Sequence, residues 1–180
     1  GEKELLNGVK LPANQTAQKD LDDTLANVFT HTNVGPYIGK QLIQMLVTSN
    51  PTPAYVGRVT AAFNNNGQGV RGDMKAVLRA ILLDPEARGD TKPDVNYGKL
   101  QEPVLMITSL LRALGGATDG VYPITHATTM GQPPFDSPTV FNFYPPDYQA
   151  PGAGILGPQF KIVQSTTSIA RANFVNNLLV

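Results

Sequence analysis

The sequence predicts an all-α fold, an array of about six packed helices with one long aromatic and proline-rich loop over residues 117–157. Three observations support this prediction. Apolar residues recur at helical spacing, helix-starting and helix-stopping residues flank the apolar runs, and patterns typical of β-strands are nearly absent. We therefore expect neighbouring helices to pack antiparallel through their apolar stripes.

The first half of the chain contains four such runs. Asn33 is a possible N-cap of the second helix, Thr52 caps the third ahead of a proline, and Asp73 caps the fourth. Residues 49–51 and 84–85 end the second and fourth helices, because the residue before a proline avoids the helical region. The apolar stripes of these four helices are Leu21, Leu25, Val28 and Phe29; Val34, Ile38, Leu42, Met45 and Leu46; Val56, Val59 and Phe63; and Met74, Val77, Leu78, Ile81 and Leu82.

The second half of the chain adds two predicted helices after a polar connector over residues 84–99. The first begins near Glu102 and stops at the glycine pair Gly115 and Gly116. The second runs from about Pro158 to the end of the sequence. Their apolar stripes are Val104, Ile107, Leu111 and Leu114, then Phe160, Val163, Ala170, Phe174 and Leu178.

The loop over residues 117–157 differs from the rest of the chain in composition. It has no lysine or arginine, and it holds seven of the fifteen prolines, which argues against helix across most of it. Loops of this length inside a compact domain are usually either functional or disordered, and the aromatic content argues against disorder. The six aromatic residues predicted to form a binding surface are Tyr122, Phe135, Phe141, Phe143, Tyr144 and Tyr148.

Length and composition exclude several classes of protein. A chain of 180 residues is expected to form a single helical domain over residues 1–180. Fourteen basic residues balance fourteen acidic ones, so no nucleic-acid partner is expected. The absence of cysteine excludes disulfides and thiolate metal sites. No apolar run approaches the roughly 20 residues needed to cross a bilayer, and no cofactor is indicated.

The stretch NNNGQGVRGD, residues 64–73, matches three functional patterns by spacing. A dinucleotide-binding loop would need a strand before its glycines, yet the preceding residues have helical periodicity, and Asp73 would place a negative charge at the phosphate. The Arg-Gly-Asp tripeptide is common by chance, and a capping role explains its aspartate. We interpret the stretch as a joint between two helices, in which positive φ angles are needed at Gly67, Gly69 and Gly72.

A calcium loop is the third possible reading of this stretch. Such a loop would begin at Asn64 and use the side-chain oxygens of Asn66 and Gln68 as ligands. Its last position is Lys75, where a bidentate carboxylate is required. These residues are therefore weak candidates for a metal site.

Two histidines are present. His126 can be grouped with Asp136 and Ser137 in the long loop as candidate catalytic residues of a hydrolase, although proximity in a loop does not establish geometry. His31 precedes a predicted helix start and is expected to help to cap it. Two histidines without thiols do not predict a structural zinc site.

Long stretches of the chain resemble the bacterial domain-of-unknown-function 1800 family. The residues that carry the resemblance are THTNVGPYIGKQLIQMLVTSNPTPAYVGRVTAAFNNNGQGVRGDMKAVLRAILLDPEAR, GKLQEPVLMITSLLRALG and GQPPFDSPTVFNFYPPDYQAPG. The resemblance implies a fragment of a longer exported protein at the periplasm or cell surface, with a secreted sulfatase-like protein as a possible partner. It implies no reaction or cofactor. Thr32 departs from the proline expected after the histidine in many relatives.

Three functional hypotheses remain open. The chain could be a helical binding or scaffold module of an exported bacterial protein, with loop 117–157 recognising a partner protein or a glycan. It could be part of a hydrolase whose active site is completed by other segments. Alternatively, the loop could be a purely structural plug of the core, which low exposure of Phe141, Phe143 and Tyr144 would favour.

Overall fold

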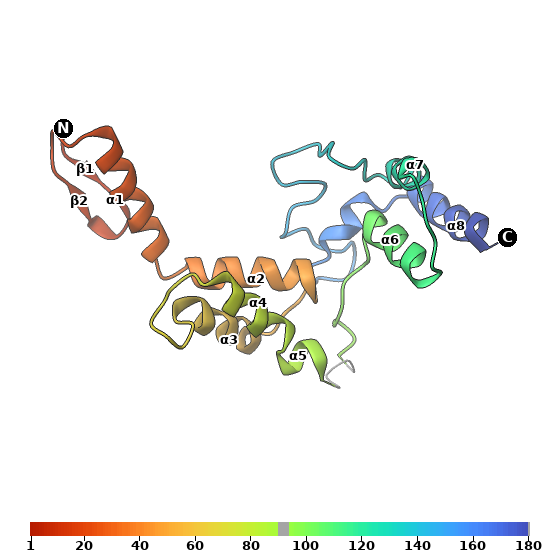
Figure 1. The fold of residues 1–180 in the computed structure, drawn as a ribbon, viewed down its shortest axis with the longest axis horizontal. Coiled ribbons are helices and arrows are strands. Elements are labelled where there is room, and N and C mark those ends of the chain that lie inside the picture. Colours follow the sequence, from red (N-terminus) through yellow and green to blue (C-terminus); the bar gives the residue numbers. More distant parts are fainter. Residues whose placement is uncertain (90–93, 180) are drawn as a thin grey trace. The chain divides into compact units, whose positions relative to one another are not determined.

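The computed structural model describes residues 1–89 and 94–179 and confirms the all-α fold (Figure 1). Two two-residue strands form a small antiparallel pair in which Lys3 lies opposite Leu11. Residues 90–93, which belong to the predicted polar connector, lie outside the described residues. The elements among the described residues are β1 Lys3–Glu4, the 3-10 turn η1 Leu6–Gly8, β2 Lys10–Leu11, α1 Ala17–Thr30, α2 Val34–Leu46, α3 Pro53–Asn64, α4 Met74–Leu82, α5 Pro85–Arg88, α6 Pro103–Ala113, α7 Val121–Thr129, the 3-10 turn η2 Pro158–Ile162 and α8 Ser165–Leu179.

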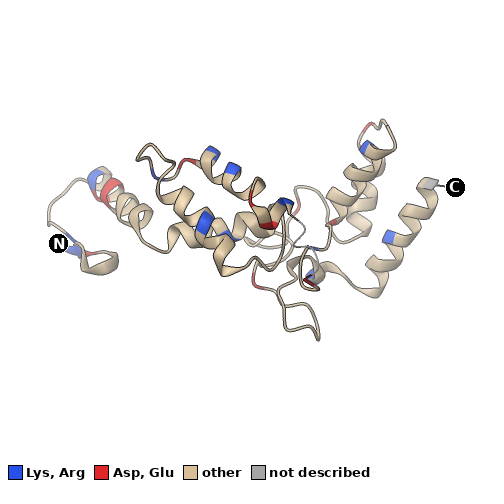
Figure 2. Ribbon diagram, turned by 90° about the horizontal axis from the view of Figure 1, so that it is seen from below, with Lys and Arg blue, Asp and Glu red and all other residues tan. Residues whose placement is uncertain are grey.

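The chain divides into two compact units. Unit 1 comprises Gly1–Leu46 and Pro51–Thr91, and unit 2 comprises Val47–Asn50 and Lys92–Val180. Each unit has buried residues of its own. That residues 1–180 form a single domain stays a prediction. Basic and acidic residues are interspersed along the helices (Figure 2).

The core of unit 1 lies between α2, α3 and α4. Glycines on α2 allow close approach to α3: a Cβ atom at Gly39 would lie 3.0 Å from the Val59 side chain. The predicted caps form, since the Thr52 hydroxyl accepts from the backbone N–H of Tyr55 and Asp73 accepts from two N–H groups of α4. The buried side chains of this core are Ile43, Tyr55, Val59, Phe63, Val77 and Ile81.

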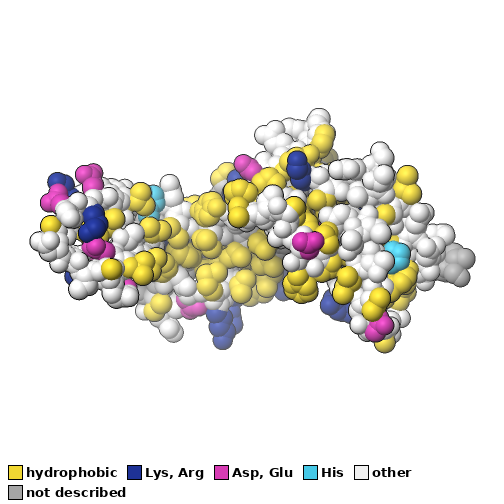
Figure 3. Space-filling model, turned by 90° about the horizontal axis from the view of Figure 1, so that it is seen from above, with side chains coloured by type: hydrophobic (Ala, Val, Ile, Leu, Met, Phe, Trp, Pro, Cys, Tyr) yellow, Lys and Arg dark blue, Asp and Glu magenta, His cyan; other side chains and the backbone are white. Residues whose placement is uncertain are grey.

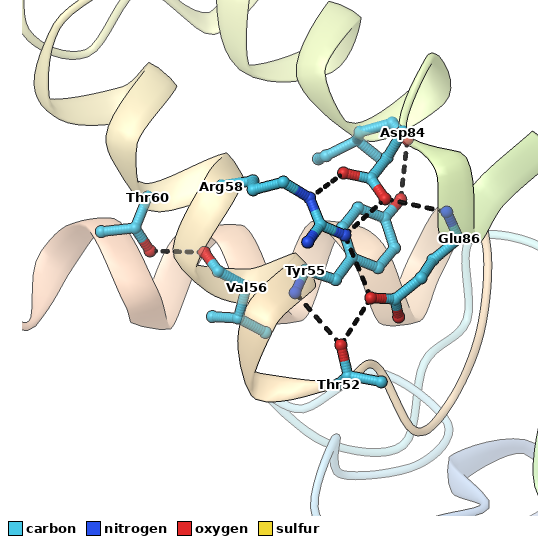
Figure 4. Close-up of polar contacts among 8 residues, drawn as sticks. Thr52, Tyr55, Val56, Arg58, Thr60, Asp84 and Glu86 are labelled. Atoms are coloured by element: carbon cyan, nitrogen blue, oxygen red, sulfur yellow. Dashed lines mark hydrogen bonds and ion pairs between the residues drawn. The ribbon is translucent and has the colours of Figure 1, made fainter.

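A polar network joins α3 to the short helix α5 (Figure 4). The Arg58 guanidinium donates to both carboxylate oxygens of the buried Asp84, at 2.7 and 2.8 Å, and also to Glu86 at 3.0 Å. Asp84 in turn caps α5 by accepting from the N–H of Glu86. The pKa of Asp84 is lowered, chiefly because Arg58 donates to its ionised form. The Asp-Pro pair that was predicted to stop a helix therefore also starts the next one.

The core of unit 2 lies between α6, α7 and α8 and consists of Ile107, Ala127, Met130 and Phe174. Helix α7 lies inside the segment predicted as a loop, because Pro123 falls in its first turn, where proline loses no helical hydrogen bond. The last helix begins at Ser165, whereas Pro158 begins the 3-10 turn η2. The remainder of the segment after α7 has no helix as far as residue 157.

Candidate functional site

The loop between α7 and η2 is fixed at its base by the Glu102 carboxylate, at the N-terminus of α6. Gln132 donates to Glu102 at 2.6 Å, and its own side-chain oxygen accepts from the N–H of Val104 at 2.9 Å. The Tyr144 hydroxyl donates to the same Glu102 oxygen. Gln132 and Tyr144 stand on either side of residues 133–143, so one carboxylate ties both ends of this stretch to α6.

The surroundings of Glu102 favour a neutral phenol beside a carboxylate. The pKa of Tyr144 is raised, first by burial and then by its hydrogen bond to Glu102. The pKa of Lys99 is lowered by burial, and the charge of Glu102 opposes this effect. A protonated Tyr144 is the hydrogen-bond donor that this geometry requires.

A second set of contacts closes the later part of the loop. The Asn50 side chain pairs with the backbone of Leu156 through two hydrogen bonds of 2.9 Å. The N–H of Gly157 donates to the carbonyl of Tyr148, and the Lys161 ammonium lies 5.4 Å from the centre of the Tyr148 ring. Residues 148–157 therefore form a closed turn held by unit 2.

The tip of the loop, residues 133–142, presents apolar side chains to solvent. Phe135 is fully exposed, Val140 is 95% exposed and Phe141 is 63% exposed. Val140 and Phe141 lie in a tight turn, in which the N–H of Asn142 donates to the carbonyl of Thr139 at 3.0 Å. Three apolar side chains thus project from a short segment whose flanks are fixed.

Two tip residues have left-handed backbone conformations. The φ angle is +64° at both Phe135 and Asn142. Asparagine tolerates this region, but for a residue such as phenylalanine it costs roughly 1–2 kcal/mol. An exposed aromatic ring on a strained backbone gains no burial in return, and such outliers are commonly retained for function.

The six predicted binding aromatics do not form one surface. Phe135 and Phe141 are exposed at the tip, whereas Phe143, Tyr144 and Tyr148 are half-buried at the base. Tyr122 lies on α7, where its ring centre is 4.2 Å from that of His126 and 5.9 Å from that of Phe174. Phe135 and Phe141 are therefore separated from Tyr122, which is 41% exposed on α7, and from the three half-buried rings at the base.

The structure does not join the candidate hydrolase residues His126, Asp136 and Ser137 by hydrogen bonds among the described residues. The His126 ring packs against Phe174 at 5.2 Å. Asp136 and Ser137 are exposed at the tip, and within residues 1–89 and 94–179 no hydrogen bond joins either of them to His126. The described residues also contain no cluster of three or more histidine, aspartate or glutamate side chains suited to a metal ion. His31 ends α1 instead, and its Nδ1 accepts from the N–H of Asn33.

The stretch at residues 64–73 is occupied by its own hydrogen bonds. The side-chain oxygen of Asn66 accepts from the N–H groups of Gln68 and Val70, and that of Asn64 accepts from Arg71. These contacts use two of the three side-chain oxygens predicted as weak calcium ligands, those of Asn64 and Asn66. A helix, α3, runs into the glycines, and the positive φ angles predicted for a joint are confirmed at Gly67, Gly69 and Gly72.

The charged residues of the Arg-Gly-Asp tripeptide also make intramolecular contacts. The Arg71 guanidinium lies 5.6 and 4.9 Å from the ring centres of Phe29 and Phe63 and donates to the carbonyls of Phe29 and His31. Asp73 caps α4 and accepts from Asn66. Both charged groups therefore stabilise unit 1.

Unit 1 also exposes apolar surface. Hydrophobic side chains gather over α2, where Tyr37, Met45 and Leu46 are exposed (Figure 3). A shallow hollow of about 200 Å³ lies nearby, and its lining offers few polar groups to orient a ligand. The residues that line it are Leu6, Val28, His31, Asn33, Val34 and Tyr37.

The family described as "Protein of unknown function (DUF1800)" matches residues 1–175. The chain belongs to this family. No curated protein and no solved structure matches the chain. Membership confirms the resemblance seen in the sequence, but the description of the family names no reaction or ligand. Separately, no helix among the described residues is long and apolar enough to cross a membrane.

The residues that fix the loop were missed by the sequence analysis. Glu102 was assigned only to a helix start, and Gln132 was not singled out. One signal was present, because glutamate is not a preferred N-cap and Glu102 makes no side-chain capping bond to α6. The Glu102 carboxylate accepts hydrogen bonds from the side chains of Gln132 and Tyr144 instead of from the backbone of α6.

Replacing Tyr144 by phenylalanine is expected to lower the free energy of unfolding by about 1–2 kcal/mol at neutral pH, because a hydrogen bond to a carboxylate is lost. Since the pKa of Tyr144 is raised by folding from an ordinary value of 10.0, its contribution is complete below pH 10 and declines as pH rises further. Urea unfolding of both proteins from pH 7 to 11 checks this. The difference between them should shrink above pH 10, and a constant or growing difference contradicts the assignment.

Proposed function

We propose that this DUF1800 chain is a binding module of an exported bacterial protein, and that the loop tip inserts its apolar side chains into a pocket of a partner protein. The main support is the environment of Phe135, because its ring is fully exposed and its backbone has a left-handed conformation. The ring projects from a loop whose two ends are tied to Glu102. A conformation fixed before binding loses little entropy when a partner is bound.

The chemistry of the tip favours a protein over a glycan. Phe135, Val140 and Phe141 have no polar group on the side chain, and Asp136 is the one charged residue in residues 133–142. Sugars are bound by aromatic faces together with several hydrogen-bonding groups, whereas protein interfaces are centred on buried apolar anchors. The chain also has no tryptophan.

The structural-plug hypothesis applies to the base of the loop. Phe143 and Tyr144 are half-buried there, and Tyr144 is held by Glu102. Phe141, which a plug would bury, is 63% exposed. The base is therefore interpreted as a support and the tip as the contact surface.

The partner and the compartment are part of the proposal. Family resemblance suggests a secreted sulfatase-like protein as the first partner to test, and an exported location for both proteins. Cell fractionation of the native host, with an antibody against this chain, tests the location. A cytoplasmic signal alone contradicts it.

Truncation of the exposed rings is expected to weaken partner binding. Phe135→Ala and Phe141→Ala should each raise the dissociation constant for the sulfatase-like protein by about tenfold or more, the effect of losing a central anchor of about 1.4 kcal/mol or more. Calorimetric titration of purified proteins measures this. Val95→Ala is the matched control, because Val95 is 94% exposed and lies outside the loop.

The outcomes separate the alternatives. Unchanged affinity in both phenylalanine variants, beside measurable binding of the wild type, contradicts the role of the tip. Absence of binding to the sulfatase-like protein, together with ring-dependent binding on a glycan array, replaces the protein partner by a sugar. An equal loss of affinity in Val95→Ala indicates that the substitutions act through a general effect on the fold.

A further inference from the structure

The sequence Asn-Gly occurs twice, at residues 7–8 and 66–67, and the structure places the two asparagines in different environments. Asparagine followed by glycine is chemically labile, because glycine has no side chain to hinder approach of its backbone nitrogen to the asparagine amide. Sequence alone assigns both pairs the same reactivity. The two pairs therefore allow one to serve as a control for the other.

Both the oxygen and the nitrogen of the Asn66 side-chain amide form hydrogen bonds. Its side-chain oxygen accepts from the N–H groups of Gln68 at 2.9 Å and Val70 at 3.2 Å, and its amide nitrogen donates to Asp73 at 2.8 Å. The attacking nitrogen, that of Gly67, is itself engaged, since it donates to the Asn65 side chain at 2.9 Å. Reaction at Asn66 requires these hydrogen bonds to open first.

Asn7 lacks such restraint. It is exposed in η1, at the turn that connects β1 and β2, and has a φ angle of +60°. Within residues 1–89 and 94–179, no side-chain hydrogen bond holds its amide. Its side chain can therefore change rotamer without breaking a hydrogen bond among the described residues.

We infer that Asn7 is a site of spontaneous deamidation and that the fold protects Asn66. The nitrogen of Gly8 attacks the side-chain carbonyl carbon of Asn7, the bond from that carbon to the amide nitrogen breaks, and ammonia leaves with the proton from Gly8. Water then opens the resulting succinimide ring at either carbonyl, which yields aspartate or β-linked isoaspartate. Both products place a new negative charge on the β1–β2 turn.

The modification changes a structured part of unit 1. The turn closes the pairing of Lys3 with Leu11 and of Glu4 with Lys10. Isoaspartate adds a backbone atom to this turn and so disturbs that register. Leu6, the neighbour of Asn7, lines the hollow beside α2, so the new charge also lies next to an apolar surface.

Peptide mapping by mass spectrometry tests the inference. The folded protein is kept in mildly alkaline buffer, and a parallel sample is kept in concentrated urea at the same pH and temperature. In urea the two asparagines should convert at similar rates. In the folded protein Asn66 should convert roughly tenfold or more slowly than Asn7, because each hydrogen bond that must open lowers the population able to react.

Two variants keep the result decisive. Asn65→Ala frees the nitrogen of Gly67 and is expected to accelerate conversion of Asn66, whether or not the loop also loosens. Asn7→Gln should abolish the early product, because glutamine would have to form a larger ring. Equal rates in the folded protein, or an unreactive Asn7 in the folded protein beside a reactive one in urea, overturn the inference.

Discussion

Phe174→Ala is expected to lower the free energy of unfolding of unit 2 by about 3–5 kcal/mol, the usual cost of truncating a buried phenylalanine. Phe174 is completely buried and belongs to the core cluster with Ile107 and Met130. The rings of Tyr122 and His126 also pack against it, at 5.9 and 5.2 Å. Its removal leaves a cavity at the point where α6, α7 and α8 meet.

Urea unfolding followed by circular dichroism measures this effect. Phe141→Ala is the matched control, because the same side chain is removed from a position that is 63% exposed. It should change stability by no more than about 0.5 kcal/mol. A loss below about 1 kcal/mol in Phe174→Ala would show that these three helices do not share a packed core.

Arg58→Ala is expected to destabilise unit 1 by about 2–3 kcal/mol, because it leaves the buried carboxylate of Asp84 without its bidentate partner. The Arg58 side chain is 46% exposed, so the expected cost lies below that of breaking a fully buried pair. The same change removes the contact between Arg58 and Glu86. The hydrogen bond from the Thr52 hydroxyl to Glu86 then remains between the start of α3 and α5.

The pH dependence of this effect has a defined sign. The pKa of Asp84 is lowered by folding, so its ion pair stabilises the folded protein above the ordinary value of 3.8. That contribution is lost as pH falls through the lowered pKa. Unfolding of wild type and Arg58→Ala from pH 7 to 2 should therefore converge below pH 3.8, and a difference that persists unchanged in acid would contradict the ion pair as its cause.

The parts of the fold that could be predicted depend on local signals. Thr52 and Asp73 cap helices through bonds to residues two or three positions away, so the chain segment itself specifies them. The helix α7 was missed because Pro123 was counted as a breaker, although proline is tolerated in a first turn. The start of α8 was placed too early because a proline begins a 3-10 turn as readily as an α-helix.

The candidate site could be predicted only in part, because its geometry depends on distant contacts. Composition identified the long loop as unusual and named Phe135 and Phe141 among its aromatics. It could not separate exposed rings from packed ones, since Tyr144 is fixed by Glu102, which lies 42 positions away in sequence. Gln132 reaches the same carboxylate across 30 positions. The unusual N-cap at Glu102 is a local signal that a partner exists, but no local pattern identifies Gln132 and Tyr144 as that partner.

Site-specific photocrosslinking shows whether a partner protein covers the loop tip. The photoreactive amino acid p-benzoylphenylalanine is placed at position 135, at position 141 or, as a control, at the exposed position 95, and each protein is irradiated with the purified sulfatase-like protein. We expect covalent adducts from positions 135 and 141 and none from position 95. Adducts that are absent at both tip positions, in a mixture shown to bind, or equal at all three positions, contradict the claim.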